Sequence, residues 1–249
     1  MINFFTGTPR SGKSLHMAMI IDKQLRKGKN VIANFEINER TYKRFNKKHP
    51  GKLGKFIFVS NTEWLTNTYK PYYDENKRRW VDPPKEHFSY IDGLYGYAQN
   101  FHKRNHRGQI IEGQTLLVLD ECQDLFNPRS WNRKDRLKWC SFFREHGKYG
   151  YEVYLISQDE SVLDKQIRHV LQYEFVHRCI NNYRLSGKIL GFIAGGKLFV
   201  CVQKMRGVRS KDAKVKTTFF TGQQRYYEFY DSYKTFGQES AAALAAADN

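Results

Sequence analysis

Residues 7–14 read Gly7-Thr8-Pro9-Arg10-Ser11-Gly12-Lys13-Ser14. This run fits the pattern G-x-x-x-x-G-K-[ST] at every fixed position. A short apolar run, residues 2–5, precedes it, and apolar residues at helical spacing follow it over residues 15–25. The order of strand, glycine-rich turn and helix is the context in which such a turn binds the phosphates of a nucleotide.

The chemistry of phosphate binding explains the spacing of this run. Backbone N–H groups curl around the phosphates, and the start of the helix adds its positive end. We expect Lys13 to reach the β- and γ-phosphates and the Ser14 hydroxyl to ligate Mg²⁺, with residues 7–14 and Leu15 forming the ATP site. Arg10 stands where glycine is common, and Pro9 lacks a backbone donor.

A second element is the apolar run 116–119, which ends in Asp120-Glu121. A buried parallel strand places such carboxylates at the carboxyl edge of the sheet, where α/β folds bind ligands. We expect Asp120 to hold Mg²⁺ through water and Glu121 to orient or deprotonate the attacking water. Asp124 is a weaker candidate that fits a turn cap.

A third element is Ile156-Ser157-Gln158, at the end of the next buried strand. Gln158 fits a sensor that contacts the γ-phosphate or positions water, and its alternative role is to cap the turn before Asp159. An acidic pair with a polar sensor on the adjacent strand is typical of hydrolysing motor ATPases and uncommon in nucleotide kinases.

The remaining pattern predicts a single α/β domain over residues 1–236. Strands are expected at 31–37, 56–59, 115–119, 153–156 and 173–179, with helices at 136–146 and 163–171. Their alternation predicts a three-layer P-loop NTPase of the RecA-like (ASCE) class with a mostly parallel core sheet. Residues 60–113 are expected to form an irregular insertion, and 189–206 a β-hairpin around Gly195-Gly196. The alanine-rich residues 240–249 resemble an added tail.

Composition excludes several classes of protein. The 249 residues are 40% hydrophobic and 27% charged, which excludes global disorder. No apolar run approaches the roughly 18 residues of a membrane helix, and four widely spaced cysteines favour a reduced, cytosolic setting. The net charge of +17 favours a polyanionic partner, either nucleic acid or an anionic membrane surface.

Several segments together resemble the Zot (zonula occludens toxin) family, the assembly ATPases of filamentous phages. They are the N-terminal phosphate loop, VIANFEIN, LLVLDE, REHGKYGYEVYLISQ, IRHVLQYEFVH and YYEFYDSY. The resemblance implies the N-terminal domain of a bitopic inner-membrane protein, on the cytoplasmic face of the host membrane, whose membrane segment is missing from this chain. It also implies a motor that extrudes phage while exchanging single-strand-binding protein for coat protein on the phage single-stranded DNA.

Relatives of this kind resemble ring motors, which implies a homo-oligomer, with a hexamer as one option. In such rings a neighbour's arginine completes the site. The candidates are Arg133, Arg136, Arg144 and Arg168, of which we favour Arg144 because it precedes the turn into the Gln158 strand. For each one the competing interpretation is a solvated helix face.

Two basic stretches stay open in interpretation. Residues 101–107 combine basic groups with aromatic rings, which suits single-stranded DNA or a solvated loop. The cluster from Lys197 to Lys216 suits DNA or anionic lipid equally. Two alternative functions also stay open: a DNA translocase or packaging ATPase, and a nucleotide kinase whose lid is the 60–113 insertion. No motif fixes ATP over GTP.

Overall fold

The computed structural model describes residues 1–66, 72–74, 79–81, 90–130, 135–183, 189, 191–192, 196–208 and 213–230. Its strands are β1 (Ile2–Thr6), β2 (Asn30–Ala33), β3 (Phe56–Phe58), β4 (Tyr72–Asp74), β5 (Arg79–Val81), β6 (Thr115–Leu119), β7 (Tyr151–Ile156), β8 (Tyr173–Cys179), β9 (Leu198–Met205) and β10 (Lys214–Thr221). Its α-helices are α1 (Lys13–Arg26), α2 (Lys43–Lys48), α3 (Asn61–Thr66), α4 (Tyr90–Phe101), α5 (Arg136–Glu145), α6 (Lys165–His169) and α8 (Gln224–Phe229).

The main sheet has eight strands in the order β10-β9-β8-β1-β7-β6-β2-β3. Strands β8 to β3 in that order run parallel, whereas β9 and β10 add antiparallel to the β8 edge. Strand β1 lies between β7 and β8, and β7 separates β1 from β6. The carboxyl ends of β1, β6 and β7 therefore lie side by side at one edge of the sheet.

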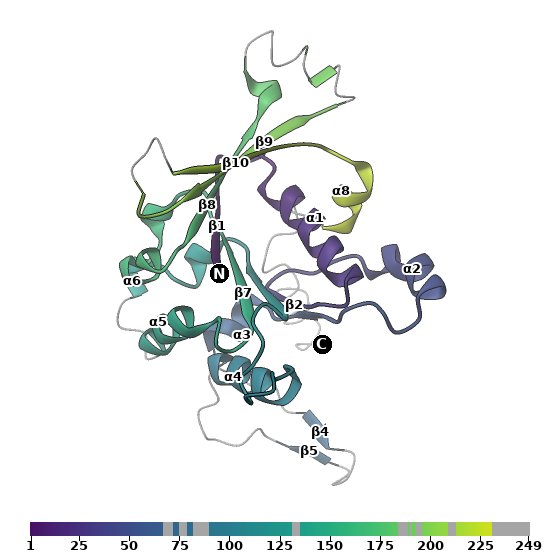
Figure 1. Cartoon of the computed structure of the whole chain (residues 1–249), viewed down its shortest axis with the longest axis vertical. Coiled ribbons are helices and arrows are strands. Elements are labelled where there is room, and N and C mark those ends of the chain that lie inside the picture. The colour runs from purple at the N-terminus through teal and green to yellow at the C-terminus, as the bar shows by residue number, and fades with distance from the viewer. Residues whose placement is uncertain are drawn as a thin grey trace, which may run out of the picture.

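Helices cover both faces of this sheet (Figure 1). Along β6, Leu117 and Leu119 face the core under α4 and α5, whereas Leu116 and Val118 face the core under α1. Helix α8 lies beside α1, on the face opposite α4 and α5. All four leucine and valine side chains are fully buried, as expected for a parallel strand covered on both faces. The predicted three-layer α/β fold is confirmed.

The prediction for residues 60–113 is wrong in part, because much of the described portion is regular and belongs to the core. Helix α4 carries Ile91, Leu94 and Ala98, which are buried in the core that it shares with α5. The hydroxyl of Tyr151 on β7 donates to the carbonyl oxygen of Leu94 at 2.7 Å. Helix α4 therefore belongs to the core of the domain, and within the described residues it is no part of a mobile lid of the kind offered for a kinase.

The predicted hairpin at 189–206 is also wrong. Residues 191–192 are helical, and β9 pairs with β8 on one side and with β10 on the other. The hairpin is instead β9–β10. The sequence does not identify β10 as a strand, because Lys214 and Lys216 fit a solvated basic patch as well as they fit an edge strand.

Some expectations fall outside the described residues, namely the boundary near 236, the tail 240–249 and Arg133. Within the described part of the chain, none of the helices combines the length and apolar character that crossing a membrane requires.

Candidate nucleotide-binding and hydrolysis site

The loop between β1 and α1 has the backbone conformation that its glycines allow. Gly7 has a φ of 141° and Gly12 a φ of 95°, both in a region that side chains resist. Arg10 has a φ of 63°, so this arginine takes the conformation for which the position commonly carries glycine. A Cβ on Gly7 would lie 2.5 Å from the carbonyl oxygen of His177, which explains why only glycine fits there.

The start of α1 offers free donors to a phosphate. No side chain caps this helix and its first turn carries no acidic residue, so its first amides point toward the loop without a side-chain acceptor. The ammonium of Lys13 donates to the carbonyl oxygens of Gly7 at 2.6 Å and Thr8 at 3.2 Å. Burial lowers the pKa of Lys13, while Asp120 and Glu121 act in the opposite direction. The loop therefore fits a bound polyphosphate.

Asp120 is buried directly after β6, and hydrogen bonds hold both its side chain and its backbone. Its Oδ1 accepts from the amide of Glu121 at 2.9 Å, and its Oδ2 accepts from the hydroxyl of Tyr230 at 2.8 Å. Asn34, at the end of β2, bonds to the backbone N–H and to the backbone oxygen of Asp120, each at 2.7 Å. Burial raises the pKa of Asp120 to about 6. Carboxylate and hydroxyl oxygens, which Asp120 and Ser14 carry, are ligands of the kind that Mg²⁺ prefers, and their role as its ligands stays a prediction.

Glu121 is held in a strained conformation by a polar chain. Its φ of 45° makes it, with Arg10, one of two non-glycine residues with positive φ in the described part of the chain. Both belong to this site, and such strain costs about 1–3 kcal/mol where it is maintained. Gln123 donates to Oε2 of Glu121 at 2.6 Å and accepts from the Ser157 hydroxyl at 2.7 Å. The carboxylate of Glu121 is thus tied to the end of β7.

Gln158 lies beside the phosphate loop. Its backbone oxygen accepts from the Thr6 hydroxyl at 2.8 Å and from the Gly7 amide at 3.4 Å, and the residue itself is exposed. This contact links the end of β7 to the start of the loop. The role of the Gln158 side chain as a sensor stays a prediction.

The structure places Arg144 away from this edge of the sheet. It is exposed near the end of α5, where it donates to the Ser141 hydroxyl at 3.0 Å. The following turn enters the amino end of β7, whereas the phosphate loop lies at the carboxyl ends. Arg136 is paired with Asp164 instead. Arg144 therefore has no place in the site of its own chain, and its role toward a neighbouring subunit stays a prediction.

Four residues that hold the acidic pair were not predicted, namely Asn34, Gln123, Ser157 and Tyr230. A signal was present for Asn34 and Ser157, since each is the polar residue directly after the carboxyl end of β2 or β7, and a weaker one for Gln123 in the turn after β6. Tyr230 follows α8 and is brought to Asp120 only by the fold, so no local pattern identifies it.

A glycine-rich loop between the first strand and helix, with an acidic pair two strands away, defines this domain as a P-loop NTPase. A solved structure agrees in fold: the N-terminal domain of zonular occludens toxin from Neisseria meningitidis is 15% identical, with a TM-score of 0.50 over 92% of this chain and 98% of that one. The model of the Zonular occludens toxin (Zot) family matches residues 86–235, which is more than half of the sequence. The chain belongs to the Zot family.

Phage proteins are similar to part of this chain. The Gene 1 protein of Enterobacteria phage M13 is 33% identical over 128 residues, which cover 49% of this chain and 36% of that protein. The Gene 1 protein of Escherichia phage If1 is 31% identical over 148 residues, covering 57% of this chain and 40% of the relative. The chain thus spans less than half the length of these relatives.

Proposed function

We propose that this chain is the Mg-ATP-hydrolysing motor domain that drives assembly and extrusion of a filamentous phage. The observation that carries the proposal is the placement of Glu121, which Gln123 ties to β7 beside Asp120, facing the side of the sheet where the phosphate loop opens. Membership of the Zot family and similarity to Gene 1 proteins of phages M13 and If1 support the phage role.

The residues divide the work of hydrolysis among them. The loop amides and Lys13 bind the phosphates, and Ser14 and Asp120 hold Mg²⁺, which when bound neutralises charge on the phosphate oxygens. Glu121 accepts the proton of the attacking water. Gln158 contacts the γ-phosphate or the water from the neighbouring strand.

The proposal includes partners beyond the nucleotide. We place the domain in a ring of identical subunits, for which a hexamer is the size to test, at the cytoplasmic face of the host inner membrane. A segment beyond this chain would anchor it, and phage coat protein and the phage single-stranded DNA complex would be its cargo. Arg144 would complete a neighbour's site, so Arg144→Ala should lower turnover of the assembled ring; unchanged turnover would remove that assignment.

Turnover measured against protein concentration tests hydrolysis and assembly together. We expect magnesium-dependent ATP hydrolysis that rises faster than linearly with concentration and falls at least a hundredfold in Glu121→Gln. Glu145→Gln is the matched control, because Glu145 is partly exposed at the opposite edge of the sheet. Turnover that rises only linearly with protein concentration would contradict a site shared between subunits. Turnover that persists in Glu121→Gln would contradict the role of Glu121 as the base.

One observation favours a DNA translocase as the second candidate. The β9–β10 hairpin exposes Lys204, Lys214 and Lys216, a basic surface suited to a phosphate backbone. Hydrolysis that single-stranded DNA strongly stimulates, with a steep loss of DNA binding as salt rises, would favour this candidate. Absence of DNA binding even at low salt would exclude it and leave anionic lipid as the partner of the hairpin.

A further inference from the structure

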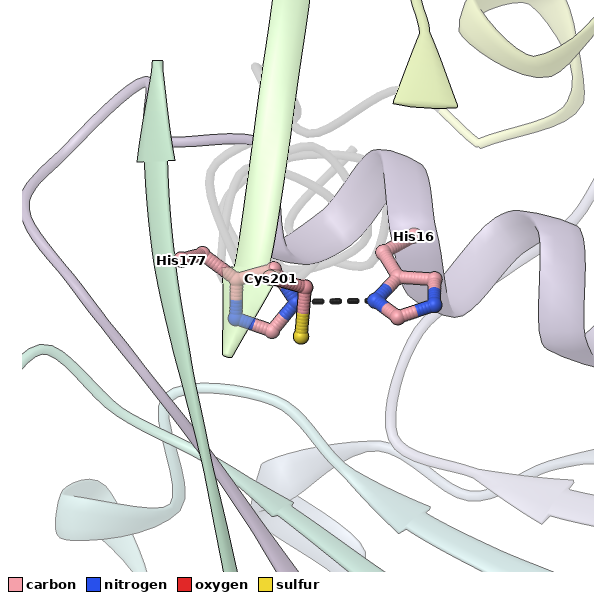
Figure 2. Close-up of side chains that lie close together, drawn as sticks. All are labelled: His16, His177 and Cys201. Atoms are coloured by element: carbon pink, nitrogen blue, oxygen red, sulfur yellow. Dashed lines mark hydrogen bonds between the residues drawn. The ribbon is translucent and has the colours of Figure 1, made fainter. Parts of the chain in front are cut away.

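Three side chains with metal-ligating atoms converge behind the phosphate loop (Figure 2). His177 on β8 and Cys201 on β9 are directly paired across the antiparallel strands, so both side chains leave the same face of the sheet. His16 reaches them from the second turn of α1. The ligand atoms of all three residues lie within 4.8 Å of one another, and the nucleotide chemistry described above uses none of them.

The hydrogen bonds of His177 fix which of its ring nitrogens carries the proton. Its Nδ1 lies 2.9 Å from the carbonyl oxygen of Phe175 and 3.3 Å from that of Thr6, so Nδ1 carries the proton and donates. Its Nε2 lone pair then accepts a hydrogen bond from Nδ1 of His16 at 2.9 Å, and a metal would take the place of that proton. A ring N–H held by a backbone carbonyl is the arrangement that commonly orients a metal-bound histidine.

Aromatic rings pack against the two imidazoles, and two of the three side chains are almost fully buried. The ring of Phe5 lies 4.6 Å from the ring of His177, and the ring of Phe220 lies 4.8 Å from that of His16. His177 and Cys201 are 1% and 2% exposed.

We propose that His16, His177 and Cys201 form a zinc site that fastens α1 to strands β8 and β9 behind the phosphate loop. Two imidazoles and a thiolate are ligands that Zn²⁺ prefers, and they supply three of the four positions of its usual tetrahedron. Zinc–ligand lengths of about 2.0–2.3 Å require the two nitrogens to separate to about 3.3 Å. The nitrogen–nitrogen distance is now 2.9 Å, so it would have to increase by a few tenths of an ångström.

Binding of Zn²⁺ at this site must release a proton. The Cys201 thiol loses its proton to solvent and becomes a thiolate, which leaves the site with a single positive charge. The proton on Nδ1 of His16 moves to Nε2 of the same ring, and both imidazoles remain neutral. Binding of one Zn²⁺ therefore releases one proton per chain.

Zinc at this position would help to fix the phosphate loop, because the loop packs against the strands that carry two of the ligands. Gly7 packs against the backbone of His177, and Gly12 packs against the ring of Phe199 on β9. The loop is thus enclosed between α1 and the strands that the metal would join. The proposal stands independently of ATP hydrolysis, since metal binding is measured without nucleotide.

Metal content and cobalt spectra of the whole chain test the site. We expect about one zinc per chain after purification without chelators, a melting temperature that falls on zinc removal, and a thiolate-to-cobalt charge-transfer band when Co²⁺ replaces zinc in excess Mg²⁺. Cys201→Ser should abolish that band, and His16→Gln should weaken binding at least tenfold. Cys179→Ser is the matched control, being a buried cysteine of β8 outside the cluster.

Two outcomes would overturn the zinc site. The first is a chain without stoichiometric zinc that binds Co²⁺ without a thiolate band, which would leave only a histidine–histidine hydrogen bond. The second is a band that persists in Cys201→Ser. If that variant fails to fold, His16→Gln decides the question, because His16 is only partly buried and its loss leaves the strand pair intact.

Discussion

The hydroxyl of Tyr230 donates a 2.8 Å hydrogen bond to Oδ2 of Asp120, across 110 residues of sequence. Asp120 is the carboxylate proposed to hold Mg²⁺, and Tyr230 directly follows α8. The side chain of Tyr230 therefore ties the end of the described chain to the proposed magnesium site. A displacement of this segment would free one oxygen of the carboxylate.

Replacement of Tyr230 by phenylalanine tests this tie. We expect Tyr230→Phe to lower the free energy of unfolding by about 1–3 kcal/mol, because a buried carboxylate oxygen loses its partner. The Mg²⁺ concentration for half-maximal turnover should rise severalfold, since the carboxylate is no longer oriented. Chemical denaturation and a magnesium titration measure the two effects. Tyr183→Phe, at a half-exposed tyrosine, should change neither.

The Ser157–Gln123–Glu121 chain should act on the chemical step alone. Gln123→Leu is expected to lower kcat about tenfold with KM for ATP within twofold of the native value, because Gln123 orients Glu121 and touches no nucleotide. Adding Ser157→Ala to Gln123→Leu should cost little more, since both changes break one chain. Gln224→Leu, on the exposed face of α8, controls for the change in polarity. A KM that rises in step with the loss of kcat would contradict a positioning role.

Arg10 stores backbone strain in the phosphate loop. We expect Arg10→Gly to raise the free energy of unfolding without nucleotide by about 1 kcal/mol, because glycine adopts a positive φ without penalty. Arg10→Ala removes the same charge but keeps a Cβ, so it should give no such gain. Urea denaturation of the three proteins separates strain from charge. Equal stabilisation by both substitutions would assign the effect to charge.

The pair between Arg136 and Asp164 gives a pH-dependent part of the stability. Its oxygen and nitrogen atoms meet at 2.6 Å, and Asp164 also caps α6 by accepting from the Gln166 amide at 2.8 Å. Burial alone would raise the pKa of Asp164, but these bonds outweigh it and hold the pKa below its ordinary value of 3.8. The stabilisation is thus present above about pH 4 and is lost as pH falls through the lowered pKa.

Asp164→Asn is accordingly expected to cost about 2 kcal/mol at neutral pH and progressively less in acid. Denaturation curves across the acid range measure the difference between the two proteins. Glu145→Gln removes an exposed ion pair with Lys148 and should cost less than about 0.5 kcal/mol. A cost for Asp164→Asn that stays constant into acid would contradict the assignment.

The nucleotide site could be predicted from sequence where its residues are close along the chain. The loop at residues 7–14 and the pair Asp120-Glu121 each carry their own strand, so hydrophobic runs identify both and the parallel sheet brings them to one edge. Tyr230 and the cluster of His16 with His177 could not be predicted, because strand pairing and helix packing bring them to their partners over long sequence distances. The β9–β10 hairpin was missed for another reason: its edge strand is charged and lacks an apolar run.

The position of β1 also governs when the phosphate loop can form. Ile2 pairs with Val153, and Asn3 pairs with both Tyr154 and Tyr173, so β1 has no sheet neighbour until residues beyond 150 have been synthesised. At about 5–20 residues per second, this apolar strand waits roughly ten to thirty seconds on the ribosome. Nucleotide cannot assist the early steps of folding, since its loop is among the last parts to be assembled.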